Sequence, residues 1–490
     1  MRARCWIAGG WLALSAITLP AHAQTTPPGV PAQPAAPETS DKPAEPEKAP
    51  TIATSLPNNG DPGGTRASLE EAGIAYSLTY IGEVLGNTRG GIRRDAVYQG
   101  RLDVQLDADL EKLLKIPGLA FHTNFYQIHG RGVSGCCLGG NLLTTSGIEA
   151  TPATRLFELW LEQKLLDGKV SVRAGQLAAD SEFILSQYGG LFVNATFGWP
   201  AITAANLPSN GPAYPLATPA VRVKLAPTDQ ITLMGAVFNG DPAGPGLGDP
   251  QRRNRDGLSF RTSDRALLIG EAAYTYNKGK DAAGLPGTIK LGGWHHLGRF
   301  DDQRFGIDGL SLADPTSSGI ARRFRGNSGI YSVIDQLVYR VPGTDDQGLG
   351  VFARISGSPS DRNLISFYAD GGLTYKGLIP GRPDDTAGVG FGYAQISQRA
   401  RGLDRDARGF GVIADAEPAT GLYSGPFLPI RSSEALIEVT YQATVVPGFT
   451  VQPDFQYVFR PGGNVSNPRD PNGAAVKNAA IFGLRATIRY

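Results

Sequence analysis

Between residues 177 and 218, carboxylates, an amide and aromatic rings lie in a stretch with no regular strand or helix pattern. Such side chains suit a polyol, because rings stack on the C–H faces of a sugar while polar groups exchange hydrogen bonds with its hydroxyls. The stretch is also too apolar for a solvated surface loop, so we expect other parts of the protein to cover it. The candidate residues here are Asp180, Glu182, Tyr188, Asn194 and Trp199.

Neighbouring segments carry polar side chains at every second residue. In residues 155–166, Phe157, Leu159 and Leu161 form one face and polar residues the other, because side chains of a strand alternate between its faces. Burying rows of unpaired charge in a dry core is costly, and a water-filled lumen removes that cost. We therefore expect the loop to fold inward and face a polar wall. The expected wall residues are Glu158, Trp160, Glu162, Arg173 and Arg222.

The sequence offers no convincing catalytic, metal or nucleic-acid site. His295 and His296 are adjacent in a strand and so point to opposite faces, which rules out a shared metal. The pair Glu158 and Glu162 could suggest a glycosidase, but such pairs arise in any charged lumen. Lys and Arg number 46 against 45 Asp and Glu, which argues against a nucleic-acid partner. We expect no enzyme activity, no cofactor and no metal.

The rest of the chain predicts an all-β protein of about sixteen strands, because strand-like segments recur between turn residues. Tight turns such as Asp167-Gly168 and Pro447-Gly448 alternate with long loops, which is typical of outer-membrane barrels. One short helix is expected over residues 109–115. The expected strands are 74–82, 97–109, 118–129, 155–166, 169–176, 219–226, 230–239, 266–277, 287–297, 328–341, 347–357, 363–375, 386–397, 433–445, 449–459 and 479–490.

The first residues predict export. Arg2 and Arg4 precede an apolar run that ends near Leu19, and Ala21-His22-Ala23 supplies the small residues of a cleavage site. We expect a Sec-type signal peptide over 1–23, a disordered Pro/Ala-rich periplasmic arm over 24–68, and a barrel domain over 69–490. No later run of 18 apolar residues predicts a membrane helix.

Together these features predict a transmembrane antiparallel β-barrel with an inward-folded constriction loop, located in the bacterial outer membrane. Its last strand, 479–490, alternates an apolar and a cationic face, and we expect Arg485 and Arg489 to point toward the pore. Cys136 and Cys137 are neighbours, so the mature chain has no disulfide framework. The expected partners are outer-membrane lipid and, at the arginine-rich loops, lipopolysaccharide phosphates. Whether the protein forms a homo-oligomer is left open.

Several motifs resemble the OprB-type carbohydrate-selective porins. The match is dense from about residue 70 to 240 and looser beyond. The residues that carry it are Leu113 to Gly118, Phe121-His122, Gln127 to Gly130, Arg155 to Gln163, Gly175-Gln176, Asp180 to Phe183, Leu191 to Asn194, Phe197 to Pro200, Leu207-Pro208 and Tyr214-Pro215.

This resemblance implies a sixteen-stranded porin that passes monosaccharides and similar small polar solutes down a gradient. It also implies that the barrel-insertion machinery reads the last strand. Three features depart from the family pattern: the long Pro-rich arm, the Cys136-Cys137 pair, and a terminal Tyr490 in place of the commoner Phe. Two alternatives remain: a secreted or surface sugar-binding or sugar-hydrolysing β-protein, and a barrel for lipid-like substrates, which the polar rows disfavour.

Overall fold

The computed structural model describes residues 50–278, 282, 284–410 and 429–490. The expected signal peptide (1–23) and the arm up to residue 49 lie outside the described residues. None of the described helices combines the length and the apolar character needed to cross a membrane.

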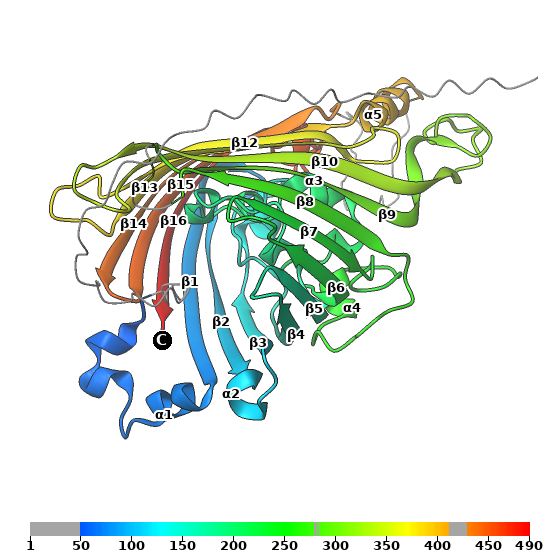
Figure 1. The fold of residues 1–490 in the computed structure, drawn as a ribbon. Coiled ribbons are helices and arrows are strands. Elements are labelled where there is room, and N and C mark those ends of the chain that lie inside the picture. The colour runs from blue at the N-terminus through cyan, green and yellow to red at the C-terminus, as the bar shows by residue number, and fades with distance from the viewer. Residues whose placement is uncertain (1–49, 279–281, 283, 411–428) are drawn as a thin grey trace, which may run out of the picture. The chain divides into compact units, whose positions relative to one another are not determined.

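Sixteen strands form one closed antiparallel sheet, which confirms the predicted barrel (Figure 1). β16 closes the barrel against β1, with Thr79 opposite Arg489 and Val84 opposite Leu484. The strands are β1 (Ile74–Gly91), β2 (Asp95–Asp109), β3 (Leu119–Gly130), β4 (Ala153–Leu165), β5 (Val170–Leu177), β6 (Thr218–Leu225), β7 (Ile231–Phe238), β8 (Leu267–Tyr276), β9 (Gly287–Gly306), β10 (Ala321–Arg340), β11 (Gly348–Gly357), β12 (Ile365–Lys376), β13 (Thr386–Ile396), β14 (Ser433–Val446), β15 (Phe449–Phe459) and β16 (Lys477–Arg489).

Short helices occupy the connections. The predicted helix at 109–115 is α2, which begins after Asp109, whose carboxylate accepts hydrogen bonds from the Glu111 and Lys112 amides at 3.0 and 3.1 Å. The helices are η1 (Ile52–Ser55), η2 (Pro57–Gly60), α1 (Thr65–Ala72), α2 (Leu110–Leu114), the π-helix η3 (Ser134–Leu138), η4 (Ala179–Ser181), η5 (Gly189–Leu191), η6 (Ala195–Phe197), α3 (Ala201–Asn206), η7 (Pro208–Asn210), α4 (Pro250–Arg253), α5 (Gln398–Phe410) and α6 (Pro461–Asn464).

The described part of the expected arm, residues 50–68, contains short helical segments. It forms η1, η2 and the start of α1, and it packs at the end of the barrel where the C-terminal residue lies. The Tyr490 hydroxyl donates a hydrogen bond to the Gly60 carbonyl, and the Arg66 guanidinium lies 4.6 Å from the Tyr490 ring centroid. These contacts order a segment that has too few apolar residues to order itself.

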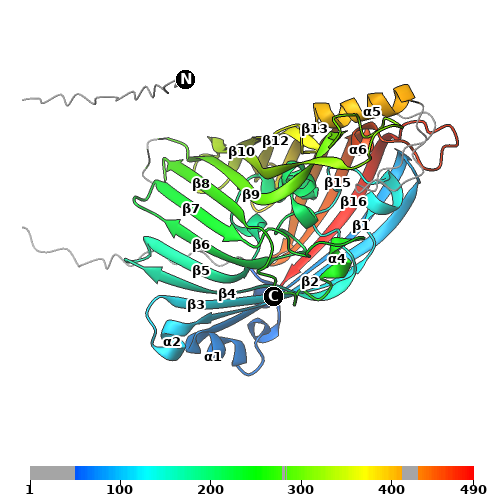
Figure 2. The ribbon, with the colours of Figure 1, turned by 90° about the vertical axis from the view of Figure 1, so that its right-hand side faces the viewer.

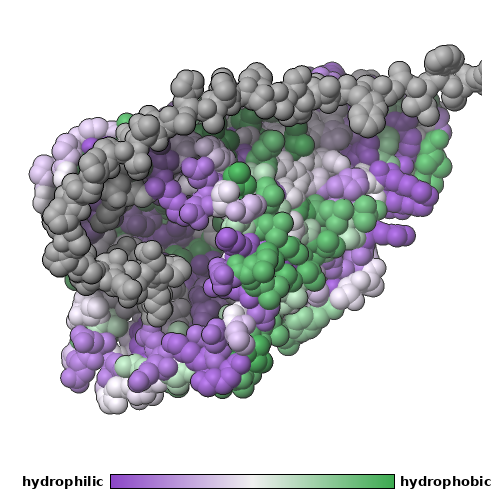
Figure 3. Space-filling view, viewed as in Figure 1, coloured by the Kyte–Doolittle hydropathy of each residue, from purple (hydrophilic) through white to green (hydrophobic). Residues whose placement is uncertain are grey.

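The outer face of the wall is apolar. Val84, Leu291, Ile330 and Phe482 are at least half exposed, at 50, 66, 71 and 55%. Figure 3 shows hydrophobic residues gathered over the outside of the strands on the right, whereas hydrophilic residues dominate the hollow on the left. An apolar outside suits lipid and would be costly in water.

Two long connections fold into the barrel. We call residues 131–152 the second loop and residues 178–217 the constriction loop; their short helices lie within the strand wall in Figure 2. Phe192 and Phe197 of the constriction loop pack against inward side chains such as Phe352, Tyr368 and Leu436. An apolar cluster therefore fills the side of the barrel formed by β11 to β16.

Candidate functional site

Carboxylates on the barrel wall hold the backbone of the constriction loop. Glu158 accepts the Ala178 amide at 3.0 Å, and Glu271 accepts the Ile184 amide at 2.9 Å. Across the barrel, Glu438 accepts the Val193 and Asn194 amides at 2.6 and 3.1 Å. A fourth carboxylate, Asp335, accepts the Ser186 hydroxyl at 2.6 Å and the Gln187 amide at 3.2 Å. Hydrogen bonds to charged acceptors compensate the cost of burying these carboxylates.

This arrangement corrects one expectation. The polar rows of β14 and β15 do face inward, but they do not line an open lumen. Glu438 and Gln456 are both 0% exposed, because the two inward loops cover them. The Gln456 amide, for example, donates to the Thr145 carbonyl of the second loop at 2.9 Å.

Arg354 of β11 also anchors the constriction loop, as a donor rather than an acceptor. It is 2% exposed and donates to the carbonyls of Ile184, Thr196 and Gly198 at 2.9, 2.8 and 3.0 Å. Its remaining donors pair with Asp370 of β12, at 2.5 to 3.2 Å. The positive charge is thus neutralised by one wall carboxylate while the guanidinium holds two separate parts of the loop.

On the opposite side, the loop begins at a compact cluster of charges. Glu182 accepts hydrogen bonds from Arg173 at 2.5 Å and from Arg222 at 2.5 and 3.1 Å. Glu162 of β4 accepts from the same two arginines, each at 3.1 Å. Two acids and two bases make this cluster neutral overall. Glu162, Glu182 and Arg173 keep 12, 14 and 16% of their side chains exposed, whereas Arg222 keeps 3%.

Trp160 fixes the position of Arg173. The guanidinium carbon of Arg173 lies 3.6 Å from the Trp160 ring centroid, which is a close cation–π contact. His122 of β3 stacks on the same indole at 4.6 Å and contacts Asp107 of β2 at 2.7 Å. Neighbouring strands β2 to β5 therefore present one continuous row of charged and aromatic groups to the interior.

A β-bulge in β4 changes the face of Phe157. Asn124 of β3 stands opposite both Phe157 and Glu158, because the register shifts between Thr123 and Phe125. Both residues on the bulged strand then point inward: Phe157 is 4% exposed and packs 4.8 Å from the Tyr126 ring. Placing Phe157 on the outer face with Leu159 was wrong for this reason.

Asp180 lies farther along the same side, beside Tyr214 and Arg101. One carboxylate oxygen accepts the Tyr214 amide at 2.8 Å, and the other is buried without a hydrogen-bond partner. Burial raises the pKa of Asp180 to about 7; the Tyr214 hydrogen bond opposes this shift and the nearby Glu158 carboxylate adds to it. Arg101 of β2 lies over the rings of Tyr126 and Tyr214, at 4.6 and 5.1 Å.

The other loop residues lie apart from this cluster. Tyr188 packs near Gly350 of β11, and its amide faces Asp335 at 3.4 Å. Asn194 is 1% exposed and donates to the Leu143 carbonyl and to Gln456 at 3.1 and 3.0 Å, so it joins the loop to the wall. Trp199 donates to the Asn210 carbonyl at 3.1 Å and borders a cavity of about 140 Å³ between the two inward loops.

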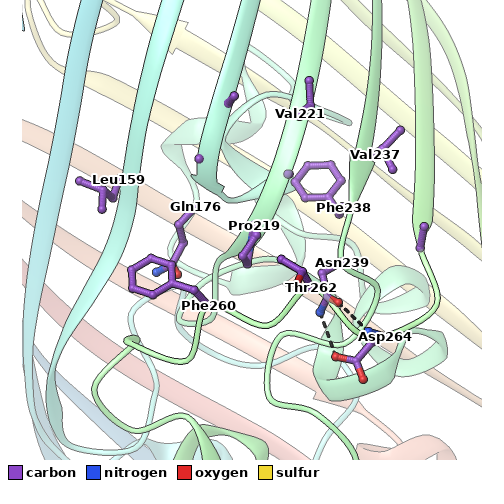
Figure 4. A pocket seen from close by; sticks show the side chains of 14 residues that line it. Leu159, Gln176, Pro219, Val221, Val237, Phe238, Asn239, Phe260, Thr262 and Asp264 are labelled. Atoms are coloured by element: carbon purple, nitrogen blue, oxygen red, sulfur yellow. Dashed lines mark hydrogen bonds between the residues drawn. The ribbon is translucent and has the colours of Figure 1, made fainter.

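A larger groove lies outside this pathway, on the lipid-facing side of β4 to β7. Figure 4 shows Val221 and Val237 lining it; these residues are 47 and 51% exposed on the outer face. Its loop-side edge is closed by Asn239, whose amide donates to Asp264 at 3.1 Å. The groove is therefore not part of a route through the barrel.

Two further points complete the description. Cys136 and Cys137 form a disulfide within η3, where the Cys137 carbonyl accepts the Ile92 amide at 2.8 Å. Within the described ranges, no group of three or more His, Cys, Asp or Glu residues could hold a metal ion.

The sequence reasoning did not select Arg101, His122, Tyr214 or Arg354. Arg101 could have been found, because it belongs to an alternating polar row in residues 97–109. The role of Arg354 had no local signal, since its loop contacts join residues more than 150 positions apart.

Known proteins resemble this chain over most of its length. Porin B of Pseudomonas aeruginosa is 27% identical over 436 residues, which cover 86% of this chain and 90% of that protein. The putative porin QuiX of Acinetobacter baylyi is 22% identical over 428 residues, covering 82 and 88%. The high-pH structure of Pseudomonas putida OprB shares the fold, with a TM-score of 0.75, 24% identity, and coverage of 87% of this chain and 97% of that one.

The family model for carbohydrate-selective porins of the OprB family matches residues 93–490, which include fifteen complete strands and both inward loops. These findings place the protein in the bacterial outer membrane. In barrels of this kind the long loops lie on the extracellular side and the short turns on the periplasmic side. The chain belongs to the OprB family of carbohydrate-selective porins.

Proposed function

We propose that the protein is a passive channel for monosaccharides and similar small polar solutes, and that its pathway runs between the wall of β2 to β6 and the start of the constriction loop. The observation that carries this proposal is the asymmetry of the interior. Apolar packing fills the side formed by β11 to β16, and a second apolar cluster packs Phe183 and Ile184 of the loop against β7 to β10. Between these two clusters, charged and aromatic groups of β4 to β6 keep partial exposure and face the start of the loop. The pathway residues that we propose are Asp180, Glu182, Glu158, Trp160, Glu162, Arg173 and Arg222.

The chemistry of the ion cluster suits a neutral polyol. Arg173 offers donors and Glu162 and Glu182 offer acceptors, so a sugar hydroxyl can replace water on either kind of group. Because the cluster is neutral overall, it gives no net Coulomb attraction to an ion of either sign. A neutral solute therefore loses less hydration free energy than an ion when it passes this point. Arg222 and Glu158, at 3 and 8% exposure, would support the cluster from beneath.

Three residues of the sequence prediction would act differently. Tyr188 would hold the loop against the wall through Asp335, and Asn194 would join it to Gln456 of the wall and to Leu143 of the second loop. Trp199 borders the cavity between the two inward loops, where its ring can contact the C–H face of a sugar before the solute reaches Asp180.

Liposome swelling with sugars of graded size tests the proposal. Vesicles that contain the refolded protein should swell in isotonic pentose and hexose faster than protein-free vesicles, with the rate falling steeply between hexoses and trisaccharides. Swelling no faster than in protein-free vesicles would refute the channel. The variant Trp160→Leu should slow hexose entry, because Arg173 loses the ring that positions it. Leu247→Ala, at a residue that is 98% exposed, is the control and should leave the rate unchanged.

The competing proposal, a sugar hydrolase, has less support. The oxygens of Glu162 and Glu182 are bound by Arg173 and Arg222 rather than facing a space for water between two acids. We propose that the protein is not an enzyme, and that lipid on the outer face and the barrel-insertion machinery are its partners. Release of p-nitrophenol from p-nitrophenyl glycosides by the purified protein would contradict the first of these points.

A further inference from the structure

An arginine-rich cleft lies at the extracellular end, away from the proposed sugar pathway. It has a volume of about 450 Å³ and opens between α5, the end of β9 and the connection 358–364. α5 packs against β9, as Figure 1 shows near the top of the barrel. The residues that line the cleft are Arg304, Phe305, Ser360, Gln398, Arg399, Arg401 and Arg405.

Helix geometry explains why these arginines converge. Arg401 and Arg405 are four residues apart on α5, so their side chains leave the same face of the helix. Arg399 comes from the first turn of α5, and Arg304 reaches the cleft from β9. The Phe305 ring lies 4.9 Å from the Arg304 guanidinium and 4.6 Å from that of Arg399, which fixes two of the four charges in place.

The positive charge of the cleft is only partly neutralised. Asp406 binds Arg304 through two hydrogen bonds of 2.7 and 2.9 Å. Asp302 lies 3.8 Å from Arg399, but it accepts a hydrogen bond from Arg322 at 2.6 Å. Over residues 50–410 and 429–490, leaving aside the omitted positions near 280, no carboxylate lies within 4 Å of Arg401 or Arg405.

Two of the guanidinium nitrogens also lack acceptors. Arg399 Nη1 and Arg401 Nε are buried, and neither makes a hydrogen bond in the described chain; Asp302 lies 3.8 Å from Arg399 Nη1, beyond hydrogen-bond distance. A buried donor without an acceptor costs about 1–3 kcal/mol, more for a charged group. A ligand that brings several negatively charged oxygens into the cleft would satisfy these nitrogens and offset the repulsion between the four arginines.

We propose that this cleft binds an anion of the phosphate or carboxylate class at the extracellular mouth. Arginine forks suit such oxygens because two parallel N–H groups match two oxygens of one anion. Two sources share this chemistry: the phosphate groups of lipopolysaccharide in the outer leaflet, and free anionic solutes such as sugar phosphates and sugar acids. The site does not depend on the proposed sugar pathway, because none of its residues belongs to the ion cluster at Glu182.

Binding of inorganic phosphate to the delipidated, detergent-solubilised protein tests the site directly by isothermal titration calorimetry. The double variant Arg401→Gln/Arg405→Gln should weaken phosphate binding at least tenfold. Arg408→Gln is the matched control, because Arg408 is an exposed arginine of the same helix that does not line the cleft, and it should change binding less than twofold. Arg401→Lys/Arg405→Lys keeps the charge and should recover part of the affinity.

Equal affinity of the double variant and the wild type, or no phosphate binding by the wild type, would overturn the proposal. Retained heat-modifiable migration on a gel shows that each variant barrel is folded, so lost binding cannot be attributed to misfolding. Native mass spectrometry in lipopolysaccharide-containing and dephosphorylated-lipopolysaccharide nanodiscs separates the sources. Lipid retention that depends on phosphate and on Arg401 and Arg405 assigns the site to the lipid; binding of phosphate or D-glucuronate without such retention assigns it to free solutes.

Discussion

Replacing Arg354 by methionine should release the constriction loop while leaving the barrel closed. Methionine keeps an unbranched side chain of similar reach but has no donor, so the carbonyls of Ile184, Thr196 and Gly198 lose their partner. At about 1 kcal/mol for each hydrogen bond, the loop loses roughly 3 kcal/mol of attachment.

The same substitution leaves Asp370 without its cation. The Asp370 side chain is 0% exposed, and removing one partner of a buried ion pair costs about 3–5 kcal/mol. The total for Arg354→Met is therefore roughly 6–8 kcal/mol. In the double variant Arg354→Met/Asp370→Asn, the unpaired charge is gone and only the loop term of roughly 3 kcal/mol remains.

Hydrogen–deuterium exchange of peptides from residues 184–198 measures this attachment. A loss of 3 kcal/mol corresponds to about 10²-fold faster exchange, and we expect this factor in the double variant and a larger one in the single variant. Peptides from β1 and β16 should exchange as in the wild type. In liposomes, both variants should admit larger sugars, because the loop no longer narrows the interior.

Arg322→Met is the control, since Arg322 pairs with Asp302 at the extracellular end and has no described contact with the constriction loop. It should change neither loop exchange nor the size limit for sugars. If Arg354→Met left exchange of 184–198 and the size limit unchanged, Arg354 would not be an anchor. If the double variant were as labile as the single one, the unpaired-charge cost would be wrong.

Three further predictions follow from the site. Burial raises the pKa of Asp180 to about 7 from an ordinary 3.8. Between these two values the detached loop has lost a proton that the attached loop still holds, so rising pH favours detachment. Attachment of residues 178–182 should therefore be strongest below about pH 4 and weaken as the pH rises to about 7. Exchange corrected for its intrinsic pH dependence should show this trend, and Asp180→Asn should abolish it. Glu182→Gln should leave the ion cluster with a net positive charge. In planar bilayers under a salt gradient, the reversal potential should then shift toward anion selectivity. Glu70→Gln, at a residue outside the barrel interior, should not change it. Arg101→Met should raise the half-saturation concentration for hexose flux about tenfold or more, because a charged hydrogen-bond donor contributes about 1.5–3 kcal/mol; an unchanged value would place Arg101 off the pathway.

Most of the wall could be predicted from the sequence, because strand alternation is a local property. All sixteen strands follow from period-two patterning and turn residues, and α2 follows from the capping position of Asp109. The largest differences are at β1, β9 and β10, which extend seven to nine residues beyond the expected bounds, whereas several other strands extend by one or two. The extensions of β9 and β10 contain many charged residues, which gives little contrast between faces.

The parts that the sequence could not predict depend on contacts between distant residues. The bulge that turns Phe157 inward has no residue signature in β4, since Asn124 on the neighbouring strand completes it. α5 was expected to be part of the long connection between residues 397 and 433, because its two glycines and many charged residues outweigh the small apolar stripe of Ala400, Leu403, Ala407 and Phe410. The hydrogen bond from Tyr490 to the Gly60 carbonyl joins residues at opposite ends of the chain, so no local pattern could predict it.

The inward carboxylates serve two purposes, and their neighbours decide which one. On β4, Glu162 faces arginines of the next strands, so its charge is satisfied within the wall and part of the side chain stays open to solvent. On β14, Glu434 and Glu438 have no arginine beside them in the described structure, and they bind loop amides instead. An acidic row without basic neighbours must find other donors once a loop excludes water. In this barrel, the row with Glu434 and Glu438 holds the loops, and the row of mixed charge on β4 to β6 is where we propose that solutes pass.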